Sequence, residues 1–302
     1  MNLLMMMNSK IIGFVCVLIT AVLFGSIYSL AKLPLSEIDP MLLSAIVYPI
    51  AFIAMVPIAR ASFRLISLDD LKSILIISVL GAVAAPLLLF YGLAEVDASD
   101  GAILANAQIL FTILLSSVFF GEMPRGLRGY GAIVIVSVGL FLASTELGLS
   151  ESMLQYEPGK LMILGAMLCW ALDNNLSRRL IKKSSVEPSK IAILKFLIGG
   201  TILFGLLMVT QPVAHVADGL VNIGESQWLA ISILAVFGFA VALFFLLEGL
   251  KRIGTIKAMV ALAFTPIVGI IIAMTTRGES ISQVEAIATV MVAIGLLIVS
   301  KS

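Results

Sequence analysis

Near its middle the chain reads Cys169-Trp170-Ala171-Leu172-Asp173-Asn174-Asn175-Leu176-Ser177-Arg178-Arg179, at the end of a long apolar segment that begins near Lys160. At about 100° per residue, a helix presents four of these side chains on one face: Trp170, Asp173, Asn174 and Ser177. A charge at bilayer depth costs about 2.5–3.5 kcal/mol, so this face is expected to point toward protein or water. The stretch therefore predicts a functional face on a membrane-spanning helix, enclosed by the rest of the chain.

The composition is typical of a membrane protein. Of the 302 residues, 61% are hydrophobic and 12% are charged, and the mean hydropathy is +1.15. Soluble domains carry about 25% charged residues. Ten segments are apolar enough to cross a bilayer: 11–31, 40–59, 73–94, 99–120, 127–144, 160–178, 190–210, 227–247, 256–276 and 283–300. The predicted fold class is an all-α polytopic membrane protein with ten transmembrane helices.

Lysine and arginine are unevenly divided between the two predicted sides of the membrane. All 19 basic residues except Lys32, Lys160 and Arg277 fall on the side of the two chain ends. Because cytoplasmic loops are enriched in basic residues, both termini are predicted to be cytoplasmic, in a protein of the plasma membrane. The net charge of +1 gives no sign of a nucleic-acid partner. Membrane lipids are the expected neighbours, and the protein is expected to be a monomer or a homodimer.

The two halves of the chain repeat one pattern. Gly81, Gly92 and Glu122 recur, at one constant offset, as Gly238, Gly249 and Glu279. Each half holds five predicted spans, and because five is odd the second half is expected to enter the membrane from the opposite side. We therefore predict two inverted five-helix repeats, residues 1–145 and 160–302, joined by a linker at 146–159. Inverted repeats suit transport by alternating access.

These motifs resemble the drug/metabolite transporter superfamily, in particular EamA-type members with two EamA units. The resemblance is carried by Phe24-Gly25 and Lys32 in the first span, by residues 169–176 in the sixth, and by the pairs Gly121-Glu122 and Gly278-Glu279. It implies a ten-helix transporter with a central cavity. It also implies export of amino acids, metabolites or drugs, or carriage of nucleotide sugars and sugar phosphates, without naming one substrate.

The predicted substrate-binding residues are Tyr28, Gln108, Trp170, Asp173, Asn174 and Lys257. Asp173 is expected to bind an ammonium group or a proton, or alternatively to form a structural ion pair with the ninth or the seventh span. For Tyr28 and Trp170 the alternative is packing, and for Gln108 it is an interhelical hydrogen bond. Lys195 is expected to extend its ammonium group toward the interface.

Several other residues carry structural predictions. Pro86 and Pro266 each remove a helix hydrogen bond and are expected to bend their spans. Ile109 stands where the second half has Pro266. Asp100 is expected in a solvated loop at a helix N-terminus, and Glu122 and Glu279 are expected to be structural.

The chain lacks the signatures of an enzyme. Cys16 and Cys169 lie inside apolar spans, His215 is the single histidine, and no metalloprotease, hydrolase or nucleotide-binding motif is present. We therefore expect no catalytic residue, no metal site and no cofactor.

The predicted function is secondary transport of a small organic solute (an amino acid, a metabolite or a drug-like compound), more often outward. Proton-coupled antiport and facilitated diffusion both fit the sequence. A lipid translocase or scramblase-like protein is one alternative. A non-transporting receptor or scaffold is another, and it predicts a packed centre with Asp173 paired and inaccessible.

Overall fold

Helices make up the described chain. The computed structural model describes residues 3–59, 66–121, 126–145, 157–184, 186–279 and 281–299, and no strand occurs among them. The first half contains α1 (Leu3–Leu35), α2 (Pro40–Met55), α3 (Leu68–Val79), the π-helical segment η1 (Leu80–Ala84), α4 (Ala85–Glu95), α5 (Ala98–Leu104), α6 (Asn106–Phe120) and α7 (Gly126–Thr145). The second half contains α8 (Pro158–Ser184), α9 (Pro188–Thr210), α10 (Val213–Val221), α11 (Glu225–Ile233), the π-helical segment η2 (Leu234–Val241), α12 (Ala242–Ile253), α13 (Thr255–Leu262), α14 (Thr265–Arg277) and α15 (Gln283–Val299). The predicted all-α class is confirmed.

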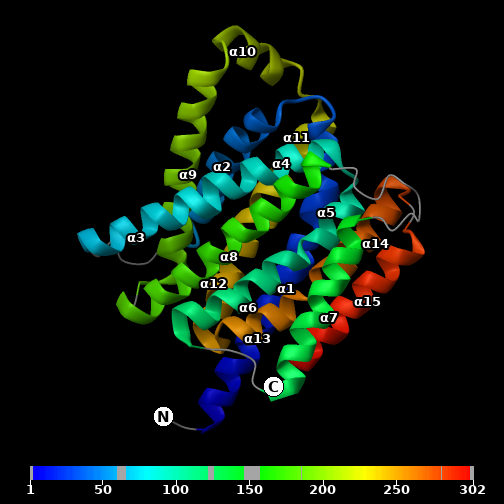
Figure 1. Cartoon of the computed structure of the whole chain (residues 1–302). Coiled ribbons are helices and arrows are strands. Elements are labelled where there is room, and N and C mark those ends of the chain that lie inside the picture. Colours follow the sequence, from blue (N-terminus) through cyan, green and yellow to red (C-terminus); the bar gives the residue numbers. More distant parts are fainter. Residues whose placement is uncertain are drawn as a thin grey trace.

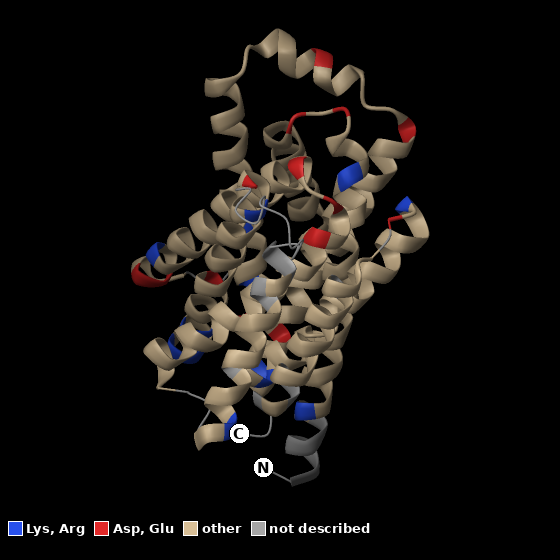
Figure 2. Cartoon of the chain, turned by 45° about the vertical axis from the view of Figure 1, so that its right-hand side comes forward, with Lys and Arg blue, Asp and Glu red and all other residues tan. Residues whose placement is uncertain are grey.

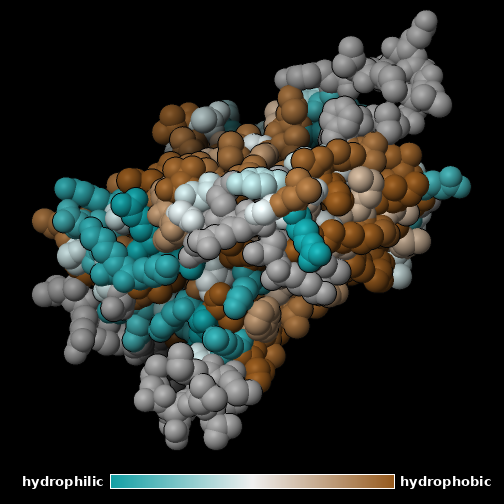
Figure 3. Space-filling model, turned by 60° about the horizontal axis from the view of Figure 1, so that its bottom comes forward, coloured by the Kyte–Doolittle hydropathy of each residue, from teal (hydrophilic) through white to brown (hydrophobic). Residues whose placement is uncertain are grey.

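Within the described chain, six helical segments are long and apolar enough to cross a membrane: Ser9–Leu35, Leu68–Glu95, Ala98–Phe120, Pro188–Thr210, Glu225–Ile253 and Thr255–Arg277. Shorter apolar helices occupy Pro40–Met55, Gly126–Gly139 and Ala286–Gly295. Most charged residues lie toward the two ends of the bundle (Figure 2). Hydrophobic side chains cover much of its flank, and hydrophilic ones gather over part of the end that comes forward in Figure 3. The protein is an integral membrane protein with several spans.

One helix was not expected. Residues 211–226 lie between the predicted spans 190–210 and 227–247, but they contain α10. Val213, Val216 and Leu220 recur there at helical spacing, and Val216 is buried. A Cβ on Gly219 would lie 2.8 Å from Leu42 Cδ2, so α10 packs on the first turn of α2. This helix is too short to cross a bilayer, so a search for membrane spans does not find it.

Helices from the two halves pack against each other in matching pairs. The helix α1 of the first half packs against α12 and α14 of the second half. The helix α8 of the second half packs against α4 and α6 of the first half. The helices α2 and α9 form one further pair, and α7 and α15 form another (Figure 1). Exchanging the two halves leaves this set of pairs unchanged. The repeat seen in the sequence is therefore also a repeat of packing.

Two helices in each half are interrupted at corresponding places. The π-helical segments η1 and η2 contain Gly81 and Gly238, respectively. Pro86 follows η1 directly, at the start of α4, where its missing N–H favours a wider turn. Such turns are frequent at functional sites. Both π-helical segments contribute residues to a central pocket, Gly81 from η1 and Phe239 from η2.

The second pair of interruptions separates α5 from α6 and α13 from α14. The first lies at Ala105 and the second at Ala263–Phe264. Pro266 follows the second break, whereas Ile109 occupies the corresponding place after the first. The first break therefore forms without a proline.

Candidate functional site

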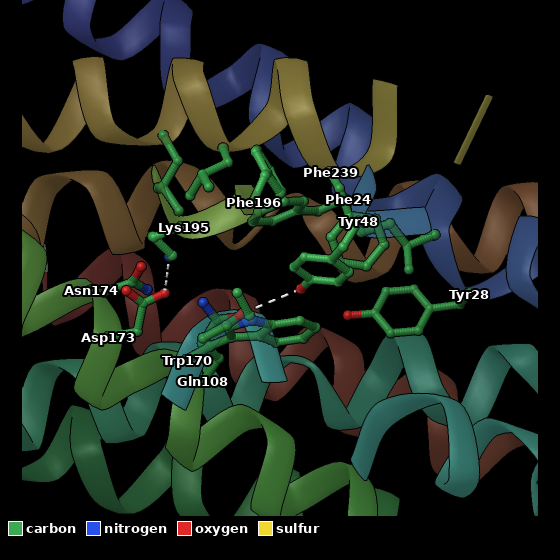
Figure 4. Close-up of a pocket in the computed structure, with 15 residues that line it drawn as sticks. Phe24, Tyr28, Tyr48, Gln108, Trp170, Asp173, Asn174, Lys195, Phe196 and Phe239 are labelled. Atoms are coloured by element: carbon green, nitrogen blue, oxygen red, sulfur yellow. Dashed lines mark hydrogen bonds and ion pairs between the residues drawn. The ribbon is translucent and has the colours of Figure 1, made fainter. Parts of the chain in front are cut away.

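A pocket lies at the centre of the bundle. Six aromatic side chains form much of its wall: Phe24, Tyr28, Tyr48, Trp170, Phe196 and Phe239. Four polar side chains complete its chemistry: Gln108, Asp173, Asn174 and Lys195. They come from α1, α2, α6, α8, α9 and η2, so both halves of the chain contribute (Figure 4).

The charges of the pocket form one buried ion pair. Nζ of Lys195 donates to Oδ2 of Asp173 at 2.5 Å, and the two side chains are only 2% and 3% exposed. The other carboxylate oxygen, Oδ1, accepts a hydrogen bond from Ser177 Oγ at 3.0 Å. Asp173 and Ser177 therefore share a helix face, as the sequence predicts. The pair carries no net charge, which limits the cost of burying it.

Gly81 in η1 is the point at which three helices meet. A Cβ on Gly81 would overlap Oδ2 and Cγ of Asp173, so only glycine allows α8 to approach this closely. The carbonyl oxygen of Gly81 accepts hydrogen bonds from Trp170 Nε1 at 3.0 Å and from the Tyr48 hydroxyl at 3.3 Å (Figure 4). The π-helical turn thus offers a carbonyl group to α2 and α8, which fixes two aromatic side chains of the pocket.

Five of the six predicted site residues line this pocket together: Tyr28, Gln108, Trp170, Asp173 and Asn174. Nδ2 of Asn174 has no hydrogen-bond partner among the described residues, although the residue is 2% exposed. Lys257 is placed elsewhere, because it is exposed on the first turn of α13 and is not part of the pocket wall. A binding role for these residues stays a prediction.

Contacts between the halves lie at both ends of the bundle. Near the start of α5, the carboxylate of Glu279 accepts hydrogen bonds from the backbone N–H groups of Ala98 and Ser99, at 3.3 and 2.9 Å. Asp100 in the same helix is 8% exposed and lies 3.6 Å from Lys160 Nζ. The prediction of a solvated Asp100 was therefore wrong, because α5 begins inside the bundle. Glu122 lies outside the described residues.

The opposite end is held by Arg178. Its Nη1 donates to Thr255 Oγ1 at 2.8 Å, and its guanidinium lies 4.6 Å from the centre of the Phe120 ring. Gly254, with φ of 78°, lets the chain turn beside this guanidinium, where a Cβ would lie 2.8 Å from Nη2. Arg178 thus ties α8 to the end of α6 and to the start of α13.

Comparison with known proteins identifies this arrangement. Residues 11–145 and 157–301 each match the model of the EamA-like transporter family. The chain belongs to this family. The resemblance read from the sequence is confirmed, and because EamA-like proteins are transporters and not enzymes, the expectation of a non-enzymatic function is confirmed as well. A transporter implies a small-molecule substrate.

Two relatives of this EamA-like protein are named uncharacterized transporters. One, from Methanothermobacter thermautotrophicus, is 26% identical over 213 residues, which cover 65% of this chain and 61% of that protein, less than two thirds of its length. The other, YyaM of Bacillus subtilis, is 26% identical over 286 residues, which cover 91% of this chain and 89% of its own. A solved crystal structure matches 97% of this chain and 98% of its own with a TM-score of 0.70 and 19% identity, which shows a shared fold.

Lys195 lines the EamA-like pocket but was not among the predicted substrate-binding residues. It was expected to reach the membrane interface, but it is buried against Asp173. This contact is the ion pair with the seventh span that was the alternative for Asp173. A lysine several residues inside a span can extend to the interface or pair with a carboxylate at the same depth. The signal was present, because Asp173 and Lys195 lie at similar depths in consecutive spans. For Tyr48, Phe196 and Phe239, the sequence showed only apolar composition, which did not indicate that they line the pocket.

Proposed function

We propose that this EamA-like transporter moves a small organic solute outward across the plasma membrane by alternating access, and that the solute occupies the central pocket. The observation that supports this is the meeting of Tyr28, Gln108, Trp170, Asp173 and Asn174 in one buried space between the two halves. Binding sites of alternating-access transporters lie near the midplane, at the interface of the repeats.

The proposed topology has ten spans in two inverted repeats, with both termini cytoplasmic. The six long apolar helices, the three shorter ones and α8 together make ten. α8 is less apolar than the others because it carries Asp173, Asn174 and Arg178, all of them buried in the protein. The exchange of matching helix pairs between the halves supports a pseudo-two-fold axis in the membrane plane.

The proposed solute is an amino acid, a metabolite or a drug-like compound without a phosphate group. Aromatic rings surround much of the pocket, and its two charges are paired with each other. A phosphorylated ligand would need several unpaired Lys or Arg side chains, and the described lining supplies one lysine that is already paired. A solute with no net charge fits best, because an added charge would be buried without compensation.

Asp173 is also the proposed proton site, should transport be proton-coupled. Its pairing with Lys195 is the arrangement that a non-transporting scaffold would show too. A scaffold, however, would have a fully packed centre, whereas this centre contains a pocket lined by aromatic and polar side chains. The cavity favours transport, with the ion pair as part of its wall.

The experiment is solute flux into liposomes that contain the purified protein. The panel should hold neutral, zwitterionic, cationic and phosphorylated solutes, and Trp170→Leu should be compared with Trp228→Leu. Trp170 lines the pocket, whereas Trp228 is 37% exposed in α11. We expect flux of at least one uncharged or zwitterionic solute, lowered at least ~10-fold by Trp170→Leu only. Absence of flux for every solute, with folding intact, would contradict transport.

A further inference from the structure

A second, smaller cavity lies beside the central pocket, at the two helix breaks. It is small, with room for about one water-sized group, and its walls come from α1, from the break between α5 and α6, and from the break between α13 and α14. Phe24, Tyr28 and Gln108 line both cavities. The two spaces are therefore neighbours that share these three side chains as a common wall.

Two buried oxygen atoms of this cavity have no hydrogen-bond partner among the described residues. They are Oδ1 of Asn106 and Oγ1 of Thr265, in residues that are 0% and 6% exposed. The amide of Asn106 is fixed in orientation, because its Nδ2 donates to the carbonyl oxygen of Ile103 at 3.0 Å. Oδ1 is thus an acceptor without a donor. Buried polar groups normally have partners, so this cavity is suited to receive one.

An uncharged donor fits this cavity better than a cation. No carboxylate is among the described residues that line it, and the carboxylate of the central pocket, Asp173, is already held by Lys195. A cation would therefore be buried without a counter-charge, which costs far more than burying a neutral group. Asn106 Oδ1 can only accept, and Thr265 Oγ1 can accept as well as donate. Hydroxyl and neutral N–H groups satisfy both atoms.

We propose that the small cavity forms one polar end of the solute site and the central pocket forms the other. The small cavity takes an uncharged hydroxyl or N–H group of the transported solute. The inference rests on the proposed transport function and names the class of solute. The donor of the solute meets Asn106 and Thr265. An acceptor of the solute meets Nδ2 of Asn174 in the central pocket, which also lacks a partner among the described residues. The apolar body of the solute lies along Phe24 and Tyr28.

A first test needs no solute and compares two threonine-to-valine changes. In Thr265→Val the unpartnered hydroxyl is replaced by a methyl group, and we expect the melting temperature to rise by about 2–4 °C. In the control, Thr112→Val, the buried hydroxyl that donates to the Gln108 carbonyl oxygen at 2.6 Å is lost, and we expect a fall of similar size. A fall for Thr265→Val would show that its hydroxyl already has a partner, and would overturn the proposal.

The second test uses each solute that the liposome panel identifies, beside its O- or N-methylated derivative. Methylation removes the donor, and we expect the uptake by the natural protein to fall about 10- to 100-fold. Thr265→Val and Asn106→Leu should lose this preference, whereas Thr265→Ser should keep it. Thr265→Val serves as the main variant, because Asn106→Leu also removes the bond to Ile103.

The outcomes separate the two proposals. Equal uptake of a solute and its methylated derivative by the natural protein would overturn the donor site and leave transport intact. Uptake of none of the solutes, with the protein folded, would overturn the transport function, and the donor site would fall with it.

Discussion

The carboxylate of Asp173 lies directly against the α-carbon of Gly81, in the space that a β-carbon would occupy. This contact places α8 against the π-helical turn η1 and positions Asp173 Oδ2 for Lys195. A helix–helix approach of this kind requires glycine, because the neighbouring atoms belong to a short side chain near its own backbone. Gly81 is therefore as much a part of the pocket as the ion pair itself.

Gly81→Ala should separate Asp173 from Lys195. The added methyl group overlaps the carboxylate, so Asp173 must move and Lys195 is left buried without its counter-charge. We expect a loss of about 3–5 kcal/mol in the free energy of unfolding. Unfolding in detergent or in lipid nanodiscs measures this loss.

Gly238→Ala is the matched control for that change. Gly238 lies in η2, the corresponding π-helical segment, where a new Cβ would be 3.0 Å from Ile27 Cγ1, in a flexible side chain. We expect a change of at most about 1 kcal/mol, because Ile27 can shift and alanine favours the helix. Equal losses in the two variants would show that the contact with Asp173 contributes no more to the free energy of unfolding than the contact with Ile27 does.

The ion pair predicts a large coupling energy between its two members. Asp173→Leu and Lys195→Met each leave one buried charge unpaired, and each should destabilise the protein by about 3–5 kcal/mol. The double variant carries no buried charge at this place, so it should recover most of that loss. A double-mutant cycle on unfolding free energies measures the coupling, and additive losses would exclude a dominant role for the pair.

Much of the fold could be predicted from hydropathy and from the repeat. Each predicted span corresponds to one helix or to two helices separated by a break. The predicted span 99–120, for example, corresponds to α5 and α6, which together run from Ala98 to Phe120. Such boundaries can be predicted from length and apolar composition, because the thickness of the bilayer sets how many consecutive apolar residues a span needs. The helix breaks at Ala105 and Ala263–Phe264 were less predictable, since only the second has a proline beside it.

The candidate site was predictable only in part. Helical spacing placed Trp170, Asp173 and Asn174 on one face, and the pocket contains all three. Which lysine meets Asp173 depends on how α8 packs against α9 and η1, and that packing is set by close contacts such as Gly199 against Ala82. Periodicity describes one helix at a time, so it could not show which of the two lysines, Lys195 or Lys257, would meet Asp173.

Glu279 predicts a stabilising contact at the start of α5. Its carboxylate accepts the N–H groups of Ala98 and Ser99, where a negative charge also interacts favourably with the helix dipole. Glu279→Gln should therefore lower the free energy of unfolding by about 1–2 kcal/mol. Asp97→Asn is the control, because Asp97 precedes the same helix but is exposed and makes no side-chain capping bond. A larger loss for Asp97→Asn would contradict the assignment.

Two neighbouring arginines provide the last prediction. Arg178 is 7% exposed and bonds to Thr255, whereas Arg179 is exposed on the other side of the same helix. Arg178→Gln removes the bond to Thr255 and the contact with Phe120, and should cost about 1–3 kcal/mol in unfolding free energy. Arg179→Gln should change it by at most about 0.5 kcal/mol. Because Arg178 joins α8 to α6 and α13, its loss should also open this end of the bundle, which a cysteine introduced at Ala258 would report by faster labelling. Equal labelling rates in the two arginine variants would mean that Arg178 does not hold this end closed.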